Sequence, residues 1–293
     1  MLKIAPKILF IRERAMGDVL MITPLIRRCY QERGGDCEIY VKTIYVDIFT
    51  DNPYVVKAFK LEENVDIKFD IIYNLDMVYE KNNDRHVLDA YEDYVFGSRT
   101  NNRYTDLYGL DSEINSVNHL LDGVGDYIVV HMRRVGINDP DQIPQNIDEN
   151  IWRVIISEIL NRTSVNIIQI GEASDLCFGG SERLFDFRTK LNIKQISTLS
   201  NESKCYIGSD SGPAHISATS SVQMIVLYTI AKIKYRMPER RNGKTISIPS
   251  NVECQGCLIN VEAGGRLNCK NNSLCRSGFS ANEIIEEVVK IIS

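Results

Sequence analysis

Two short stretches of the chain combine residue types that can hold an anion or accept a proton. The later stretch, Cys205–Thr219, is expected to run from a strand through a tight turn into a helix. Gly208–Gly212 supplies turn residues, and Pro213 suits the first position of a helix. The first backbone N–H groups of a helix have no partner inside it, so such a turn can bind a phosphate. An ordinary strand-to-helix connection is the alternative interpretation.

The earlier stretch has the same form near the start of the chain. Lys7–Ile11 predicts a short strand, Arg12–Asp18 follows as a turn, and the apolar Val19–Ile22 leads into a helix that Pro24 kinks or restarts. A carboxylate on such a turn can take a proton from a hydroxyl group, as a general base does. From the sequence alone, the favoured role of Asp18 is to cap the helix that follows, and catalysis is the other role open to it.

The motifs Met16–Asp18 and Ser209–His215, in this order, resemble those of the heptosyltransferase family of glycosyltransferases, the ADP-heptose:lipopolysaccharide group. The resemblance is specific in these two motifs and extends loosely over nearly the whole chain. It implies the GT-B architecture, in which two Rossmann-like domains face a cleft. In this family the first domain binds the acceptor and the second binds the nucleotide-sugar.

The resemblance also implies a role for each motif residue. Asp18 matches the aspartate proposed as general base, and Met16 and Gly17 form the acceptor-side turn. Glu172 matches an acidic residue that contacts the nucleotide ribose, and a solvated loop acid is its alternative. The second motif approaches the donor's diphosphate and sugar through Ser209, Asp210, Ser211, Gly212 and His215. Gly212 lets the backbone come close to a ligand, whereas a packed core side chain is the alternative for His215.

One loop departs from the family pattern. Family members commonly carry a phosphate-binding lysine after the first strand of the second domain, where this chain reads His131-Met132-Arg133-Arg134. A guanidinium can supply the same charge with a bidentate fork, so Arg133 or Arg134 is expected to replace the lysine. No Asp-x-Asp pair lies near the two motifs, and we expect no catalytic divalent ion, as the family also implies.

Four of the eight cysteines cluster near the end of the chain, at Cys254, Cys257, Cys269 and Cys275. The C-x2-C spacing of the first pair lets two thiolates bind one ion, and four thiolates can close a tetrahedral zinc or iron site. We expect one structural metal ion there, with free surface thiols or chance disulfides as the alternative. Iron is implied only by the resemblance to autotransporter heptosyltransferases, which carry a cysteine-bound iron.

The composition is that of a globular protein long enough for two domains. Its 293 residues are 44% hydrophobic and 25% charged, with a net charge of −5. No apolar run reaches the length of a membrane span or of a signal-peptide core, so we expect a cytoplasmic protein. Six basic residues between Lys232 and Lys244 can attract phosphate, although a solvated loop also explains them.

The alternation of strand and helix patterns predicts an α/β protein with two Rossmann-like domains. The first domain is expected over residues 1–122, before a linker at Asp122–Gly125. The second is expected over 126–279, including the cysteine loop 254–275. A capping box at Ser280–Glu283 begins a final helix over 280–293, whose apolar stripe is predicted to pack back on the first domain.

The leading hypothesis is a glycosyltransferase that inverts the anomeric centre and uses an ADP-heptose-like donor. The acceptor is expected to be a saccharide, a lipopolysaccharide core or a protein, and a peripheral membrane contact and the oligomeric state stay open. The alternatives are a catalytically silent nucleotide-sugar binding module or assembly subunit, and a phage-type enzyme acting on modified DNA. The charge of −5 does not favour a nucleic-acid surface.

Overall fold

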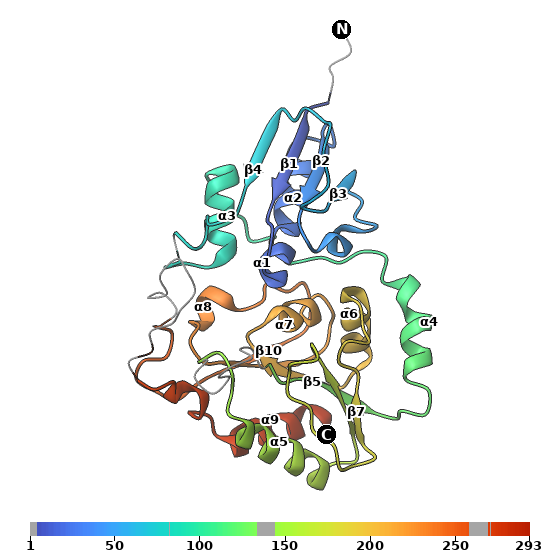
Figure 1. The fold of residues 1–293 in the computed structure, drawn as a ribbon, viewed down its shortest axis with the longest axis vertical. Coiled ribbons are helices and arrows are strands. Elements are labelled where there is room, and N and C mark those ends of the chain that lie inside the picture. Colours follow the sequence, from blue (N-terminus) through green and yellow to red (C-terminus); the bar gives the residue numbers. More distant parts are fainter. Residues whose placement is uncertain (1–4, 82, 134–143, 258–268, 270) are drawn as a thin grey trace.

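The computed structural model describes residues 5–81, 83–133, 144–257, 269 and 271–293, which form two α/β domains (Figure 1). Each domain contains one parallel sheet, with the strand orders β3-β2-β1-β4 and β10-β9-β8-β5-β6-β7. The first sheet consists of β1 (Lys7–Ile11), β2 (Glu38–Lys42), β3 (Lys57–Phe59) and β4 (Ile71–Asn74). The second consists of β5 (Tyr127–His131), β6 (Asn166–Ile170), β7 (Leu184–Asp186), β8 (Tyr206–Ser209), β9 (Met224–Tyr228) and β10 (Thr245–Pro249).

The first sheet is apolar on both faces. Successive side chains of a strand point to opposite faces, so a continuous apolar run supplies both. Ile8 and Phe10 point into the main core, where α1 (Met16–Leu20), α2 (Thr23–Glu32) and α3 (Val87–Phe96) pack. Leu9 points to the other face and packs under the segment that contains Phe69. Pro24 lies in the first turn of α2, so the helix restarts there as the sequence predicts.

The second sheet lies between two helical layers. Ile128 and Val130 of β5 face α5 (Glu149–Arg162) and α9 (Ala281–Ile292), whereas Tyr127 and Val129 face α6 (Ile193–Glu202) and α7 (Gly212–Ser217). The core on the α6 and α7 side is continuous with that of the first domain. This arrangement confirms the predicted pair of Rossmann-like domains.

The final helix packs differently from the prediction. Helix α9 lies on α5, where Ile284 and Val288 join Trp152 and Ile155 in one buried cluster (Figure 1). Its start is capped as expected, since the Ser280 side chain accepts a hydrogen bond from the Glu283 N–H. The expectation that it crosses back to the first domain is wrong. An apolar stripe requires an apolar partner but does not specify it, and α5 offers one within the second domain.

The boundary between the domains also differs from the prediction. Helix α4 (Asp111–Leu120) precedes the expected linker but packs against α6 of the second domain (Figure 1). The Gln195 Nε2 donates to the Ser116 Oγ at 3.0 Å across this contact. By packing, the first domain therefore ends before α4, and the placement of 111–122 in it is wrong. A mostly polar helix carries little sequence information about which domain it covers.

The site of a doubly wound sheet can be located from its strand order. The order reverses at a switch point, and ligands bind there, beyond the carboxyl ends of the strands. The switch points lie between β1 and β4 in the first sheet and between β5 and β8 in the second. The remaining short elements are η1 (Val46–Phe49), α8 (Ile233–Arg236) and η4 (Leu274–Arg276).

Among the described residues, no helix has both the length and the apolar character that crossing a bilayer requires.

Candidate active site between the two domains

Asp18 lies on the first turn of α1, directly beyond the carboxyl end of β1. The residue at the N-cap position is Ala15, with a φ of 65°, and no side chain caps the helix. The predicted role of Asp18 as a cap is therefore wrong. Its buried carboxylate forms two ion pairs instead, with Arg12 (Nη2 to Oδ2, 2.6 Å) and with Arg236 (Nη1 to Oδ1, 3.1 Å).

The two arginines reach Asp18 from different domains. Arg12 follows β1 and also pairs with Glu80, at 2.7 Å between Nη2 and Oε1. Burial by itself lowers the pKa of Arg12, but Tyr91, Asp18 and Glu80 together raise it above its usual value. Arg236 ends α8 of the second domain, and burial opposes the charged form there too, yet Asp18 is the first of the groups that raise its pKa. Both guanidinium groups are therefore positively charged beside the Asp18 carboxylate.

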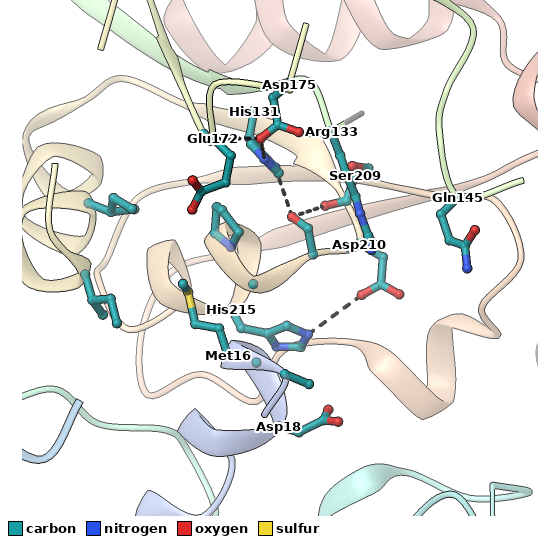
Figure 2. Close-up of a pocket in the computed structure, with 18 of the residues that line it drawn as sticks. Met16, Asp18, His131, Arg133, Gln145, Glu172, Asp175, Ser209, Asp210 and His215 are labelled. Atoms are coloured by element: carbon teal, nitrogen blue, oxygen red, sulfur yellow. Dashed lines mark hydrogen bonds and ion pairs between the residues drawn. The ribbon is translucent and has the colours of Figure 1, made fainter. Parts of the chain in front are cut away.

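The second motif forms the strand-turn-helix that its sequence predicts. Strand β8 ends at Ser209, Ser211 is the N-cap residue of α7, and Pro213 lies in the first turn. The Ser211 Oγ donates to the Ser209 carbonyl at 3.0 Å and lies 3.0 Å from the Nδ1 of His131. The other ring nitrogen, Nε2, is 3.1 Å from the Oδ2 of Asp175 (Figure 2). The orientation of the serine hydroxyl is thus set by a buried histidine and a carboxylate.

The two motifs meet directly, because α1 packs against α7. A Cβ atom on Gly17 would lie 2.8 Å from the Cδ2 of His215, and one on Gly212 would lie 3.1 Å from the Cβ and Sδ of Met16. Figure 2 shows Met16 and Asp18 of α1 beside His215 of α7. A side chain on Gly17 would therefore force a shift at this contact, and one on Gly212 would be tight against Met16. The expected reason for Gly212, close approach of the backbone to a ligand, stays a prediction.

A cavity of about 710 Å³ lies between the two switch points. Such a volume is typical of a site for a small organic ligand. Residues of both domains line it, including Tyr45 of the first and Leu191 and Ile196 of the second. It is also lined by ten of the residues that the sequence analysis selected, namely Met16, Gly17, Asp18, Arg133, Glu172, Ser209, Asp210, Ser211, Gly212 and His215.

The cavity differs in character along its length. Near α7 it is polar, with the Nη1 of Arg133 donating to the Asp210 carbonyl at 3.2 Å. Farther along, Glu172 follows β6, and burial followed by the Glu172 charge raises the pKa of Tyr45. The apolar side chains of Leu191, Ile193 and Ile196 line the cavity as well. Arg134, the other candidate for the phosphate-binding charge, lies outside the described residues.

Comparison with solved structures identifies this architecture. A glycosyl transferase family 9 protein from Veillonella parvula superposes with a TM-score of 0.71 at 13% identity, covering 98% of this chain and 97% of that one. Escherichia coli ADP-heptose lipopolysaccharide heptosyltransferase II gives 0.68 at 12%, covering 98% of each chain. The chain has the heptosyltransferase fold. No family model matches the sequence, and a search of curated proteins gave no match.

A third solved structure with this fold is the iron-containing dodecameric glycosyltransferase TibC from enterotoxigenic E. coli H10407, with a TM-score of 0.70 at 13% identity. The superposition covers 100% of this chain and 78% of TibC. All three identities are low, so these likenesses establish the fold, and the predicted resemblance to the heptosyltransferases is confirmed at that level.

The four clustered cysteines of this chain lie in one region of the second domain. Burial, followed by the charges of Cys257, Cys269 and Cys254, raises the pKa of Cys275 to about 12. Burial, followed by the charges of Cys254 and Cys269, also raises the pKa of Cys257, so the other thiols of the cluster lie near both Cys257 and Cys275. Within the described part of the chain, no three His, Cys, Asp or Glu side chains are arranged as ligands of one ion. The predicted cysteine loop spans 254–275, and its residues 258–268 and 270 lie outside the described part of the chain.

Sequence reasoning missed three polar residues of the site. His131 was part of a quoted loop without a role, and Asp175 carried no signal, since it precedes a strand too short to recognise. Arg236 belonged to a basic run whose preferred interpretation was a solvated loop. Only the fold brings it to Asp18, which is 218 positions away in the chain. The positions of Arg133 and Glu172 at strand ends, by contrast, follow from the strand pattern.

Proposed function

We propose that this protein is an inverting glycosyltransferase that moves a heptose from ADP-heptose to a hydroxyl group of an acceptor. The proposal rests on one observation, the meeting of the Asp18 turn and the Ser209–His215 turn around one cavity. The neighbours with this fold are named as glycosyltransferases, and one of them is an ADP-heptose lipopolysaccharide heptosyltransferase.

In the proposed reaction Asp18 is the general base. Its carboxylate takes the proton of the acceptor hydroxyl while the acceptor oxygen forms a bond to the anomeric carbon. The bond from that carbon to the phosphate oxygen breaks, and its electron pair leaves with the nucleoside diphosphate. Asp18 projects from the first domain and the donor turn from the second. In the proposed reaction the acceptor attacks the face of the sugar opposite to the departing diphosphate, and such an attack inverts the anomeric centre.

The donor is expected to lie along the second-domain side of the cavity. Its diphosphate contacts the turn Ser209–Gly212, with His215 and Arg133 supplying further donors. Glu172 binds the ribose, and the base lies against Tyr45 and the neighbouring apolar side chains. Preorganised donors of this kind stabilise the charge that develops on the leaving group. We propose that guanidinium groups serve this role with no catalytic divalent ion.

Calorimetry with ADP, GDP and UDP tests the donor site without knowledge of the acceptor. ADP is expected to bind more tightly than the other two nucleotides. Release of ADP from ADP-heptose, in the presence of a candidate lipopolysaccharide-core or protein acceptor, then separates a transferase from a silent binding module. A wild-type protein that binds none of the three nucleotides contradicts the transferase proposal.

We also propose that Cys254, Cys257, Cys269 and Cys275 hold one structural metal ion. The nearness of the other clustered thiols to Cys275 and Cys257 supports this, since thiolates that bind one ion must lie together. Four protein ligands leave no open position, so the ion orders the loop and takes no part in the reaction. The iron-containing neighbour TibC makes iron the first candidate and zinc the second.

Elemental analysis of protein purified without a metal-affinity column tests the metal proposal. About one equivalent of iron or zinc is expected in the wild type, and its loss and a lower melting temperature are expected in a Cys254→Ser/Cys257→Ser variant. Cys177→Ser is the matched control, because Cys177 lies elsewhere in the second domain. Equal and trace metal in all three proteins overturns the proposal.

A further inference from the structure

The carboxylate of Asp18 is held on both sides. Arg12 pairs with its Oδ2 and Arg236 pairs with its Oδ1, so each oxygen already faces a guanidinium group. A general base must present a carboxylate oxygen to the hydroxyl proton that it removes. Each oxygen has a second lone pair, but both already face a cation in a buried site. If Asp18 is the base of the proposed transferase, opening one of these ion pairs frees an oxygen for the acceptor hydroxyl.

The two ion pairs differ in how firmly the arginine is held. Arg12 is bound by three carboxylates, since Glu80 and Asp76 pair with it at 2.7 and 3.6 Å in addition to Asp18. Arg236 has an ion pair with Asp18 as its one carboxylate contact among the described residues. Its other support is the ring of Tyr79, 4.3 Å from the guanidinium carbon. Its buried Nε makes no hydrogen bond to any described residue. Arg236 is therefore the arginine that can change partner.

The position of Arg236 supplies the second partner. The residue lines the same cavity as the turn Ser209–Gly212, and the charge of Asp210 contributes to its pKa, so it is near the proposed diphosphate position. Among the described lining residues, Arg133 and Arg236 are the two that carry a permanent positive charge. Five carboxylates line the cavity as well, at Asp18, Asp47, Glu172, Asp175 and Asp210.

This balance makes Arg236 the natural counterion of an anionic ligand. A diphosphate brings at least two negative charges into a cavity whose described carboxylates already outnumber its arginines. Charge-assisted hydrogen bonds from a guanidinium to phosphate are short and often bidentate. A nucleoside diphosphate therefore competes with Asp18 for the same guanidinium group.

We propose that Arg236 is a shared counterion, paired with Asp18 in the empty protein and transferred to the donor's diphosphate when the donor binds. The transfer uncovers the Oδ1 of Asp18 for the acceptor hydroxyl. It links donor binding in the second domain to the availability of the base in the first. The acceptor hydroxyl, or water, then meets an open base only when the donor is in place. This inference rests on the proposed function for its catalytic meaning, but its binding step is tested separately.

A double-mutant cycle on ADP affinity tests the shared counterion. Calorimetry is carried out on the wild type, Asp18→Asn, Arg236→Met and the double variant, with ADP and adenosine as the probes. Methionine keeps an apolar stem over Tyr79 while it removes the charge. We expect Arg236→Met to weaken ADP binding by about tenfold or more and to leave adenosine binding unchanged. We expect Asp18→Asn to tighten ADP binding by about three- to tenfold, because it releases Arg236.

Two control variants separate this effect from general electrostatics. Asp47→Asn removes another carboxylate that lines the cavity from the first domain, and it should change ADP affinity by less than about twofold. Lys234→Met removes an exposed charge from the same short helix as Arg236 and should have no effect.

The decisive comparison is the effect of Asp18→Asn in the two Arg236 backgrounds. Tightening that disappears in the Arg236→Met background supports the shared counterion. Equal tightening in both backgrounds, or none in either, overturns it. Failure of the wild type to bind ADP, GDP and UDP contradicts the proposed function itself, and the inference falls with it. Retained turnover in Asp18→Asn, by contrast, excludes Asp18 as the general base. The competition between Asp18 and ADP for Arg236 is still measured by the ADP affinities.

Discussion

The two sides of the cavity hold their polar groups by different means. On the first-domain side, Asp18 is fixed by ion pairs with two arginines. On the second-domain side, Ser211 is fixed by a hydrogen bond to the Ser209 carbonyl and by the ring of His131. The first side therefore presents a carboxylate paired with guanidinium groups, and the second presents a hydroxyl group held by a carbonyl and an imidazole. The proposed function assigns the reacting base to the first side and the donor's diphosphate to the second.

The largest expected effect comes from removing the charge on the first-domain side. Asp18→Asn keeps the shape of the side chain but cannot accept a proton, so sugar transfer should fall by roughly a hundredfold or more. ADP release from ADP-heptose measures this, and a melting curve shows whether the variant folds. Asp47→Asn is the control and should retain most of the activity. Unchanged turnover in a folded Asp18→Asn protein removes the residue from the mechanism.

A smaller effect is expected where the two sides touch. Gly17→Ala places a Cβ 2.8 Å from the buried ring of His215, whereas Gly212→Ala places one 3.1 Å from the flexible side chain of Met16. The packed ring of His215 can move less than the flexible thioether of Met16. Gly17→Ala should therefore force α1 away from α7. We expect it to lower turnover by about tenfold or more, against a few-fold loss for Gly212→Ala.

Steady-state kinetics with ADP-heptose compare these glycine variants directly. A larger loss for Gly212→Ala than for Gly17→Ala would contradict the assignment of both glycines to the contact between domains. It would favour instead the close approach of the ligand to the α7 turn.

The smallest effect concerns a contact between the domains that lies outside the cavity. The Nδ1 of His86 accepts from the Leu88 N–H at the start of α3, and its Nε2 lies 3.0 Å from the Met237 carbonyl. Burial is the main cause that lowers the pKa of His86 below 6.5. As the pH falls, His86 therefore becomes protonated in the unfolded chain at a higher pH than in the folded protein. The stabilisation by neutral His86 is present above pH 6.5 and is lost as the pH falls from there through the folded pKa.

Chemical denaturation at several pH values tests this. The free energy of unfolding of the wild type should fall by about 1 kcal/mol for each unit by which folding lowers the pKa of His86. His86→Asn, which keeps a capping side chain, should show a flatter dependence on pH. His119→Asn on the exposed face of α4 is the control and should behave as the wild type does. A steep dependence that persists in His86→Asn would assign it to other groups.

The strands and the two motifs could be predicted from the sequence because their signals are local. The apolar run Lys7–Ile11 is β1 itself, and Pro213 lies in the first turn of the helix that it predicts. Gly97 ends α3 in the left-handed conformation that glycine favours, as its position suggests. Each of these features depends on a few neighbouring residues, so tertiary packing does not change it.

Contacts between distant segments could not be predicted in the same way. The apolar stripe of α9 could pack on several apolar surfaces. Only the complete fold places the surface of α5 beside it. Strand β7 has three residues and helix α8 has four, too short for a periodic pattern. Arg236 is consequently indistinguishable in sequence from the exposed Lys234. Its role depends on an ion pair with a residue of the other domain.

The packing of α9 on α5 has a mechanical consequence. A final helix that crossed back would tie the two domains together at a second place. Here α9 stays on the second domain, so the C-terminal helix adds nothing to the attachment between the domains. They are held together by the packing of α1 on α7, by the buried core that continues across both domains, and by ion pairs such as Lys194 with Asp51 at 2.8 Å. The attachment of the two domains therefore depends on the same contacts that form the walls of the cavity.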